Sequence, residues 1–194
     1  MATLDDINTL PEARFLTLDD KMAIAEQGDR RSPKSITISQ LTSLMELGNP
    51  ARGQVSIQNN TTVTDVVVAG TFYESGVNGT LDSSTVVNFT ALTDNRLGLR
   101  YTGNDTRIFW VYGSADCTAG NNQMLAIRLA KNGTPIPATE CRAFTGSNAQ
   151  EGKLVTTWMI ELATNDVVTL VLANPDATVD ITIKRARLVA NAIS

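Results

Sequence analysis

The chain has 194 residues and a mass of 20.8 kDa, enough for one domain of ordinary size and a short additional segment. Hydrophobic residues make up 42% of it and charged residues 19%, which is the composition of a folded protein and not of a disordered one. The formal net charge of -4 argues against a surface of clustered Lys and Arg, so nucleic acid is not an expected partner.

The first six residues include the acidic pair Asp5-Asp6 and contain no apolar stretch. We therefore expect neither a signal peptide nor insertion into a membrane. The protein is expected to stay in the cytoplasm where it is synthesised. Without a secretory route, the Asn-x-Ser/Thr sequences are interpreted as turn residues and not as glycosylation sites. These begin at Asn59, Asn60, Asn78, Asn88, Asn104 and Asn132.

Residues 1–50 form the first predicted domain, because Gly48, Asn49 and Pro50 mark a boundary before a long region rich in β-branched residues. Two short apolar stretches, 22–26 and 35–38, flank a polar turn and predict a hairpin. Ser39 then caps a predicted helix over 40–47, with its apolar residues on one face. Such a small unit buries too little surface to be stable alone, so it is expected to pack on something else.

The same stretch, from Phe15 to Met45, resembles the anchoring modules at the N-termini of bacteriophage fibre and appendage proteins. The resemblance implies a virion anchor made by apolar side chains of the hairpin and the helix. These are Ile24, Ile36, Ile38, Leu41, Leu44 and Met45. The other interpretation is an ordinary hairpin and helix that pack on the domain that follows.

Residues 51–194 form the second predicted domain and consist of strand after strand. The predicted strands are 54–58, 65–73, 86–92, 97–101, 106–114, 123–130, 153–162, 167–172, 179–184 and 187–192. No helical crossover falls between them, so the sequence predicts an all-β jelly-roll sandwich and not a parallel α/β sheet. The Asn132-Gly133 pair predicts a tight hairpin turn, because both positions tolerate positive φ.

Two of these strands, around 66–68 and over 167–172, are apolar on both faces. One face can belong to the core of the sandwich. A lone domain rarely leaves a large apolar face in water, so the other face is expected to contact another subunit.

The order of short motifs resembles the trimeric jelly rolls of the tumour-necrosis-factor (TNF) and complement-head type, in the form carried by phage capsid fibres and decorations. The motifs include Thr71-Phe72-Tyr73, Ile108-Phe109-Trp110-Val111-Tyr112 and a closing stretch over 179–193. The resemblance implies a homotrimer with an apolar interface around its axis. The residues assigned to that interface are Tyr73, Phe109, Tyr112, Leu170 and Leu172.

Arg185 and Arg187 interrupt the alternation of the last predicted strand pair, so its register stays open. They are interpreted either as binding an anion or acidic groups of a neighbour, or as a charged sheet edge.

Little in the sequence predicts catalysis. The chain has no histidine, which removes the usual general base and the Ser-His-Asp arrangement. The Asp residues at predicted loop ends are interpreted as turn formers and not as metal ligands. Cys117 and Cys141 lack the paired spacing of a zinc site and are expected to behave as small buried hydrophobic residues. We therefore expect no enzymatic activity, no cofactor and no metal.

The sequence-based hypothesis is a non-enzymatic structural protein of a bacteriophage virion, assembled in the host cytoplasm. It is a homotrimeric capsid decoration or fibre, attached through its N-terminal arms to a major capsid, collar or tail protein. Three weak arms held together bind far more tightly than one. The alternative is a receptor-binding fibre tip that recognises a host surface glycan or protein through loops over 74–84 and 139–150.

Overall fold

The computed structural model describes residues 21–24, 34–37, 50–84, 86–147 and 150–193, and its chain divides into two compact units, Met1–Asn49 and Pro50–Ser194. In the first unit, β1 (Lys21–Ile24) pairs antiparallel with β2 (Lys34–Thr37), so the hairpin predicted there is present. Ile24 and Ile36 lie on these strands. The predicted helix, with Ile38, Leu41, Leu44 and Met45, lies outside the described residues.

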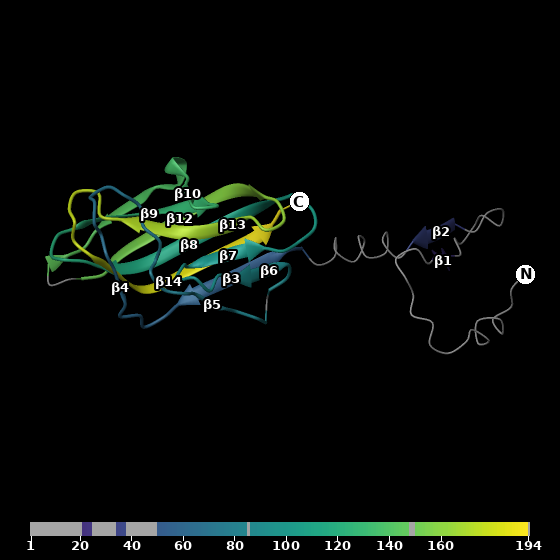
Figure 1. The fold of residues 1–194 in the computed structure, drawn as a ribbon, viewed down its shortest axis with the longest axis horizontal. Coiled ribbons are helices and arrows are strands. Elements are labelled where there is room, and N and C mark those ends of the chain that lie inside the picture. The colour runs from purple at the N-terminus through teal and green to yellow at the C-terminus, as the bar shows by residue number, and fades with distance from the viewer. Residues whose placement is uncertain (1–20, 25–33, 38–49, 85, 148–149, 194) are drawn as a thin grey trace, which may run out of the picture. The chain divides into compact units, whose positions relative to one another are not determined.

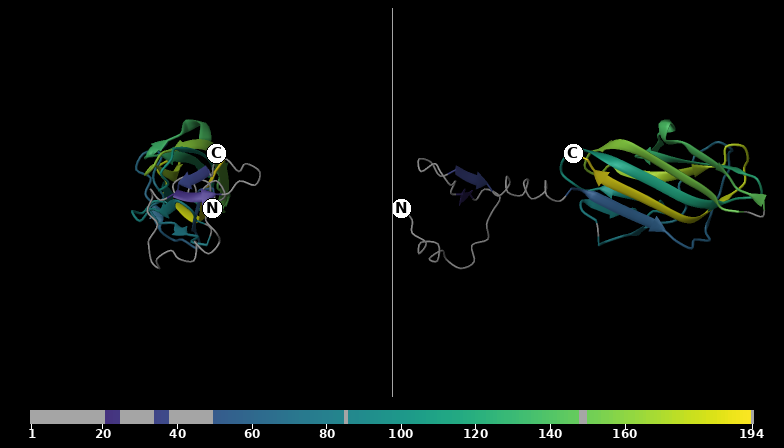
Figure 2. Two further views of the ribbon diagram at one scale, coloured as in Figure 1. Left: turned by 90° about the vertical axis from the view of Figure 1, so that its right-hand side faces the viewer. Right: turned by 180° about the vertical axis from the view of Figure 1, so that it is seen from behind.

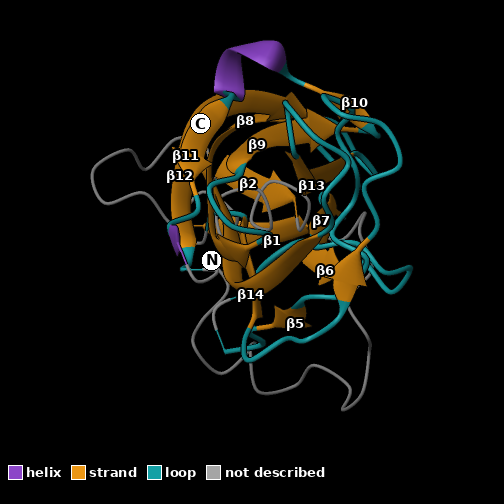
Figure 3. Cartoon of the chain, turned by 90° about the vertical axis from the view of Figure 1, so that its left-hand side faces the viewer, coloured by secondary structure: helices purple, strands orange, loops and turns teal. Residues whose placement is uncertain are grey.

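The second unit, called the head below, is a sandwich of two antiparallel sheets (Figures 1 and 3). The first sheet has the order β12-β8-β14-β3-β5, with β4 paired to β14. Its strands are β3 (Arg52–Ile57), β4 (Val63–Thr64), β5 (Thr80–Leu81), β8 (Arg107–Thr118), β12 (Gly152–Leu162) and β14 (Ile181–Ala192). The predicted all-β jelly roll is confirmed.

The second sheet has the order β10-β9-β13-β7-β6, with β11 paired to β9. Its strands are β6 (Phe89–Ala91), β7 (Gly98–Tyr101), β9 (Met124–Lys131), β10 (Thr134–Pro135), β11 (Cys141–Phe144) and β13 (Val167–Ala173). A short 3-10 turn, η2 (Pro137–Thr139), joins β10 to β11. The sequence analysis did not predict β10 and β11, because both are short and one contains a proline.

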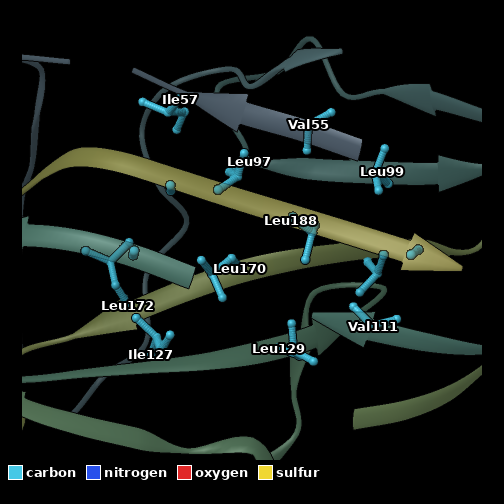
Figure 4. Close-up of a cluster of buried hydrophobic side chains, with 14 of the residues drawn as sticks. Val55, Ile57, Leu97, Leu99, Val111, Ile127, Leu129, Leu170, Leu172 and Leu188 are labelled. Carbon is cyan, nitrogen blue, oxygen red and sulfur yellow. The ribbon is translucent and has the colours of Figure 1, made fainter. Parts of the chain in front are cut away.

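The core lies between the sheets and is made of alternate side chains from the long strands (Figure 4). Val55, Val111 and Leu188 of the first sheet meet Leu129 and Leu170 of the second, and all five are almost completely buried. At one end of the core, the rings of Phe89, Tyr101 and Phe109 pack together, with centroids 4.9 to 5.3 Å apart. Such tilted and edge-on ring contacts add to the stability that burial provides.

The last strand is continuous, which corrects the prediction of two strands over 179–184 and 187–192. β14 runs through both segments and pairs with β8 on one side and β3 on the other. A register shift between Ile183 and Arg185 marks a β-bulge at Lys184. The bulge breaks the alternation of inward and outward residues within one strand, which is why the sequence predicted two strands here.

The predicted strand over 65–73 is wrong, because these residues form a loop that runs beside the second half of β13. Next to this loop, the Phe72 ring contacts Arg128 and the Glu74 carboxylate contacts Thr169, and these contacts cover the outer side of β13. Tyr73 makes an isolated bridge to Leu172 of β13, and the Gly70 amide donates to the Asn174 carbonyl at 2.8 Å. Every residue of β13 is therefore buried within one head, on both faces. The run of valines at 66–68 is split: Val66 is buried, whereas Val67 and Val68 are exposed.

The predicted Asn-Gly turn is confirmed. Asn132 and Gly133 have φ of 50° and 78° and join β9 to β10, with Lys131 opposite Thr134. All the non-glycine residues with positive φ in the described chain are asparagines: Asn59, Asn88, Asn95, Asn122, Asn132 and Asn165. Asparagine tolerates this region better than other side chains, which supports the interpretation of the asparagine-rich sequence as turn chemistry.

Candidate functional site

The outer side of the first sheet carries an apolar surface. Along β8, the residues Phe109 and Val111 point into the core, so Ile108, Trp110 and Tyr112 between them point outward. Along β12, the same alternation places Val155, Thr157 and Met159 outward. Val189 of β14 and Ile193 after it extend this surface. We call the side chains Ile108, Trp110, Tyr112, Val155, Met159, Val189 and Ile193 the apolar face.

The strand register brings these side chains next to one another. Trp110 lies directly opposite Met159 of β12 and Asn191 of β14. Tyr112 lies between Thr157 and Val189 in the next outward row. Opposite residues on one side of an antiparallel sheet have Cβ atoms about 5 Å apart, so the rows form one continuous surface.

Much of this surface is in water in a single chain. Trp110 is 46% exposed, Val155 52% and Met159 56%, and Ile108 and Ile193 are also exposed. Scattered surface hydrophobic residues are ordinary, but a continuous row that includes a tryptophan indicates an interaction surface. The surface is built on long regular strands, which hold it in a defined shape.

The neighbouring sheet edge is also open. β12 has 11 residues and, within the described chain, pairs only with β8. A long edge strand with free backbone groups invites pairing with other chains unless something covers it. The apolar face and this edge therefore lie side by side, and together they form the candidate interaction surface of the head.

The structure corrects most of the predicted trimer interface. Phe109, Leu170 and Leu172 are buried in the core of a single head, where they cannot contact another subunit. Tyr73 bridges to Leu172 of β13, beside the second sheet, and its hydroxyl accepts the Val68 amide proton. Tyr112 alone among the five lies on the apolar face.

Leu170 and Leu172 were assigned to the interface because their strand, β13, is apolar on both faces. β13 needs no partner because the loop over 65–73 covers it. The signal that locates the exposed surface is the unbroken run from Ile108 to Tyr112, which is apolar on both faces and whose outer side no described segment of the head covers. Val155 and Val189 were missed because each stands between polar or core residues in the sequence, and Met159 because its run is apolar on both faces and does not show which side is exposed.

The described residues contain no group of three or more His, Cys, Asp or Glu side chains placed to hold a metal ion. Asp166 acts as a turn residue, accepting the Ala163 amide at 2.9 Å and an amide proton of the Asn132 side chain at 2.8 Å. Asp94 pairs with Arg96. Within the described part of the chain, no helix has the length and apolar character needed to cross a bilayer.

The structure shows what Arg185 contacts and where Arg185 and Arg187 lie in the first sheet. Its guanidinium donates to Asp116 at 3.0 Å and to Glu151 at 2.8 Å. Both arginines lie on β14, which has β8 on one side and β3 on the other. The interpretation of Arg185 and Arg187 as a charged sheet edge is therefore wrong. The acidic groups that pair with Arg185 belong to its own chain and not to a neighbour.

Comparison with known proteins identifies the fold. No family model and no curated protein matches the sequence. Among solved structures, murine APRIL superimposes with a TM-score of 0.50 and 13% identity, over 72% of this chain and 98% of that one. Eiger TNF from S. frugiperda gives a TM-score of 0.49 and 10% identity, over 75% and 94%. The PRD1 vertex protein P5 gives 0.40 and 12%, over 75% and 98%.

With two antiparallel sheets and this similarity, the head is a TNF-like jelly roll. At such low identity the similarity identifies the fold alone, and function depends on the site.

Proposed function

We propose that this chain is a non-enzymatic structural protein that assembles as a homotrimer through the apolar face and the adjacent edge of β12. The N-terminal unit attaches the trimer to a larger particle, and the proposed particle is a bacteriophage virion. The observation that carries the proposal is the row of Trp110, Met159 and their neighbours on the outer side of the first sheet.

The physical reason is the free energy of exposed apolar surface. Removing it from water contributes roughly 25 cal/mol per Å², so a surface with several large side chains can hold subunits together. A second copy of the chain is the partner that is present wherever the protein is made. Because the face and the β12 edge are different surfaces, contact between them is heterologous and closes into a ring when the rotation is right.

The position of the N-terminal unit in the sequence supports a role in attachment. The head begins at β3 and ends at β14, and these two ends lie together: Arg52 is opposite Asn191, and the Ala192 amide donates to the Ala51 carbonyl at 2.8 Å (Figure 2). The chain therefore enters the head at the end where β14 finishes. The loops over 58–62 and 174–180 lie at the other end of these strands and stay free for contacts away from the attachment point.

The assembly is tested by measuring the mass of the full chain in solution. One chain has a mass of 20.8 kDa, so a trimer has three times that, about 62 kDa. We expect the trimer mass for the wild type and a lower mass for Trp110→Glu, because the substitution places an unpaired charge in the interface. Val67→Glu is the control, since Val67 is 66% exposed in the loop after β4 and belongs neither to the apolar face nor to β12. A monomeric wild type at micromolar concentration contradicts the proposal.

Attachment is tested separately by deleting residues 1–47. We expect the shortened protein to keep its trimer mass and to be absent from purified virions. If the shortened protein fails to fold, the N-terminal unit belongs to the structure of the head and the attachment role is wrong. If it still joins the particles, another surface makes the contact.

A further inference from the structure

A hollow lies on the outer side of the first sheet, beside the β14 bulge and beyond the apolar face. It has a volume of about 330 Å³ and is open to solvent. Its lining comes from three adjacent strands, β3, β8 and β14, and from the residue that follows β3. The polar side chains around it belong to Ser56, Gln58, Ser114, Asp116, Arg185 and Arg187.

The acidic groups beside the hollow are already engaged. Asp116 accepts a hydrogen bond from Nε of Arg185 at 3.0 Å, and Glu151 accepts one from a terminal nitrogen of the same guanidinium at 2.8 Å. One arginine therefore occupies both carboxylates. Little negative charge is left there for a second cation.

Arg187 is that second cation. Within the described residues, it makes no hydrogen bond and no ion pair. In the strand register it stands between Ser114 of β8 and Ser56 of β3, and the hydroxyls of these two serines also have no partner among the described residues. Small neighbours on both sides leave the guanidinium accessible from the hollow.

Three unused donor groups therefore converge on one place. A guanidinium offers five N–H donors in a planar fork, and each serine hydroxyl offers one more. The fork matches the spacing of two oxygens on a carboxylate or phosphate. Because no acceptor among the described residues bonds to these donors, the arrangement suits a ligand that brings oxygen acceptors and negative charge.

We propose that this hollow is a binding site for a small free oxyanion of the phosphate or carboxylate class, held by Arg187 with Ser56 and Ser114. The site is complete in one head. It also deepens the proposed function, because the hollow and the apolar face share one side of the sheet. When a second copy covers that side, an anion on Arg187 prevents the burial of an unpaired charge.

A free anion is favoured over a carboxylate of a neighbouring copy, on the assumption that the proposed trimer forms. In a ring of copies whose strands run along the axis, residues at the same height along the axis meet. Near the height of Arg187 each copy also carries Lys153 and Arg185, and the acidic residues there, Asp116 and Glu151, are paired with Arg185. The unpaired carboxylate on this side of the sheet, Glu161, lies at the far end of β12.

The test uses the full chain and inorganic phosphate. Phosphate is titrated into the wild type, Arg187→Gln and Arg100→Gln, by calorimetry and by melting temperature, against chloride at equal ionic strength. Arg100 is an exposed arginine on β7 of the other sheet and serves as the matched control. The comparison between variants is needed because phosphate stabilises many folded proteins without binding to them.

We expect saturable binding to the wild type and to Arg100→Gln, and a loss of affinity of roughly tenfold or more in Arg187→Gln, as for a charge-assisted hydrogen bond. Ser114→Ala should weaken binding by less. Equal binding to the wild type and Arg187→Gln overturns the site, as does the absence of binding.

The mass in solution is also measured for these variants, with and without phosphate. If Glu161→Gln weakens the trimer as much as Arg187→Gln does, and phosphate changes neither, a neighbour's carboxylate fills the hollow and the free-anion proposal is wrong. A monomeric wild type that binds phosphate through Arg187 contradicts the trimer and leaves the anion site standing. A trimer that does not bind phosphate contradicts the site alone.

Discussion

The guanidinium carbon of Arg128 lies 4.2 Å from the centroid of the Phe72 ring. This contact joins β9 to the loop over 65–73, and Arg128 also pairs with Glu140. The loop thereby helps to cover the outer side of β13, which otherwise exposes an apolar strand. One side of the head is thus covered by a segment of the head itself, whereas no described segment of the head covers the apolar face.

Phe72→Ala should loosen this loop. The substitution removes a half-buried ring and a cation–π contact, and we expect a loss of about 1 kcal/mol or more in the free energy of unfolding. The amides of Gly70 and Tyr73 donate to the carbonyls of Asn174 and Leu172 and so hold the loop beside β13. They should exchange faster with deuterium. Phe144→Ala is the control, because Phe144 is 65% exposed and should change stability by less than about 0.5 kcal/mol. Unchanged exchange in Phe72→Ala would show that other contacts hold the loop.

Glu74 should make the stability of the head depend on pH. Burial raises the pKa of Glu74, and the hydrogen bond from Thr169 and the charge of Arg96 offset this only in part. Its other carboxylate oxygen is buried without a partner in the described structure. Because the folded-state pKa lies above the unfolded value, folding favours the protonated form, and this contribution is lost as pH rises through the folded-state pKa.

Glu74→Gln should therefore be more stable than the wild type at pH 7, by roughly 1 kcal/mol, with a difference that shrinks towards pH 4. Urea unfolding at a series of pH values measures this. Thr169→Val is the companion variant: it removes the hydrogen bond that favours the carboxylate, so its stability should fall more steeply with rising pH. Parallel pH curves for the wild type and Glu74→Gln would refute the assignment.

Gly113 is required by the close approach of the two sheets. A Cβ at this position on β8 would lie 2.7 Å from Cδ1 of Leu170 and 3.2 Å from Cδ2 of Leu129. Gly113→Ala should destabilise the head by about 1 to 3 kcal/mol, since a filled core must shift to admit the methyl group. Gly120→Ala is the matched control, with its nearest neighbour at 3.4 Å. Equal urea midpoints for the two variants would show that the sheets separate at little cost.

The two thiols should differ in reactivity. Cys117 is 1% exposed, and burial together with the nearby Asp116 and Glu151 raises the pKa of its thiol to about 12. A buried, protonated thiol is a poor nucleophile, so in the native protein at pH 8 a thiol reagent should label Cys141, which is partly exposed, well before Cys117. Mass spectrometry of the labelled peptides distinguishes the two. Rapid labelling of Cys117 without denaturant would mean that the first sheet opens readily.

Several features of the head follow from local sequence. The long strands β8, β12 and β13 were predicted because their β-branched and apolar residues extend over many positions. The Asn132-Gly133 hairpin was predicted because its turn needs two residues that accept positive φ. Short elements such as β10 and β11 escaped prediction, since a few residues carry too little periodicity to distinguish a strand from a loop.

Local sequence is enough to specify an all-β head with asparagine-rich turns, because backbone preference and alternation act between near neighbours. Which apolar side chains face water depends on packing between distant segments. Leu170 and Leu172 are as hydrophobic as Trp110 and Met159, but the first pair lies between two sheets and the second lies on an uncovered face. Burial depends on what packs over each side of a strand. On the core side of β13 that is the first sheet, and on its outer side it is the segment around Phe72 and Glu74, since Glu74 bonds to Thr169 at a separation of 95 residues in the chain.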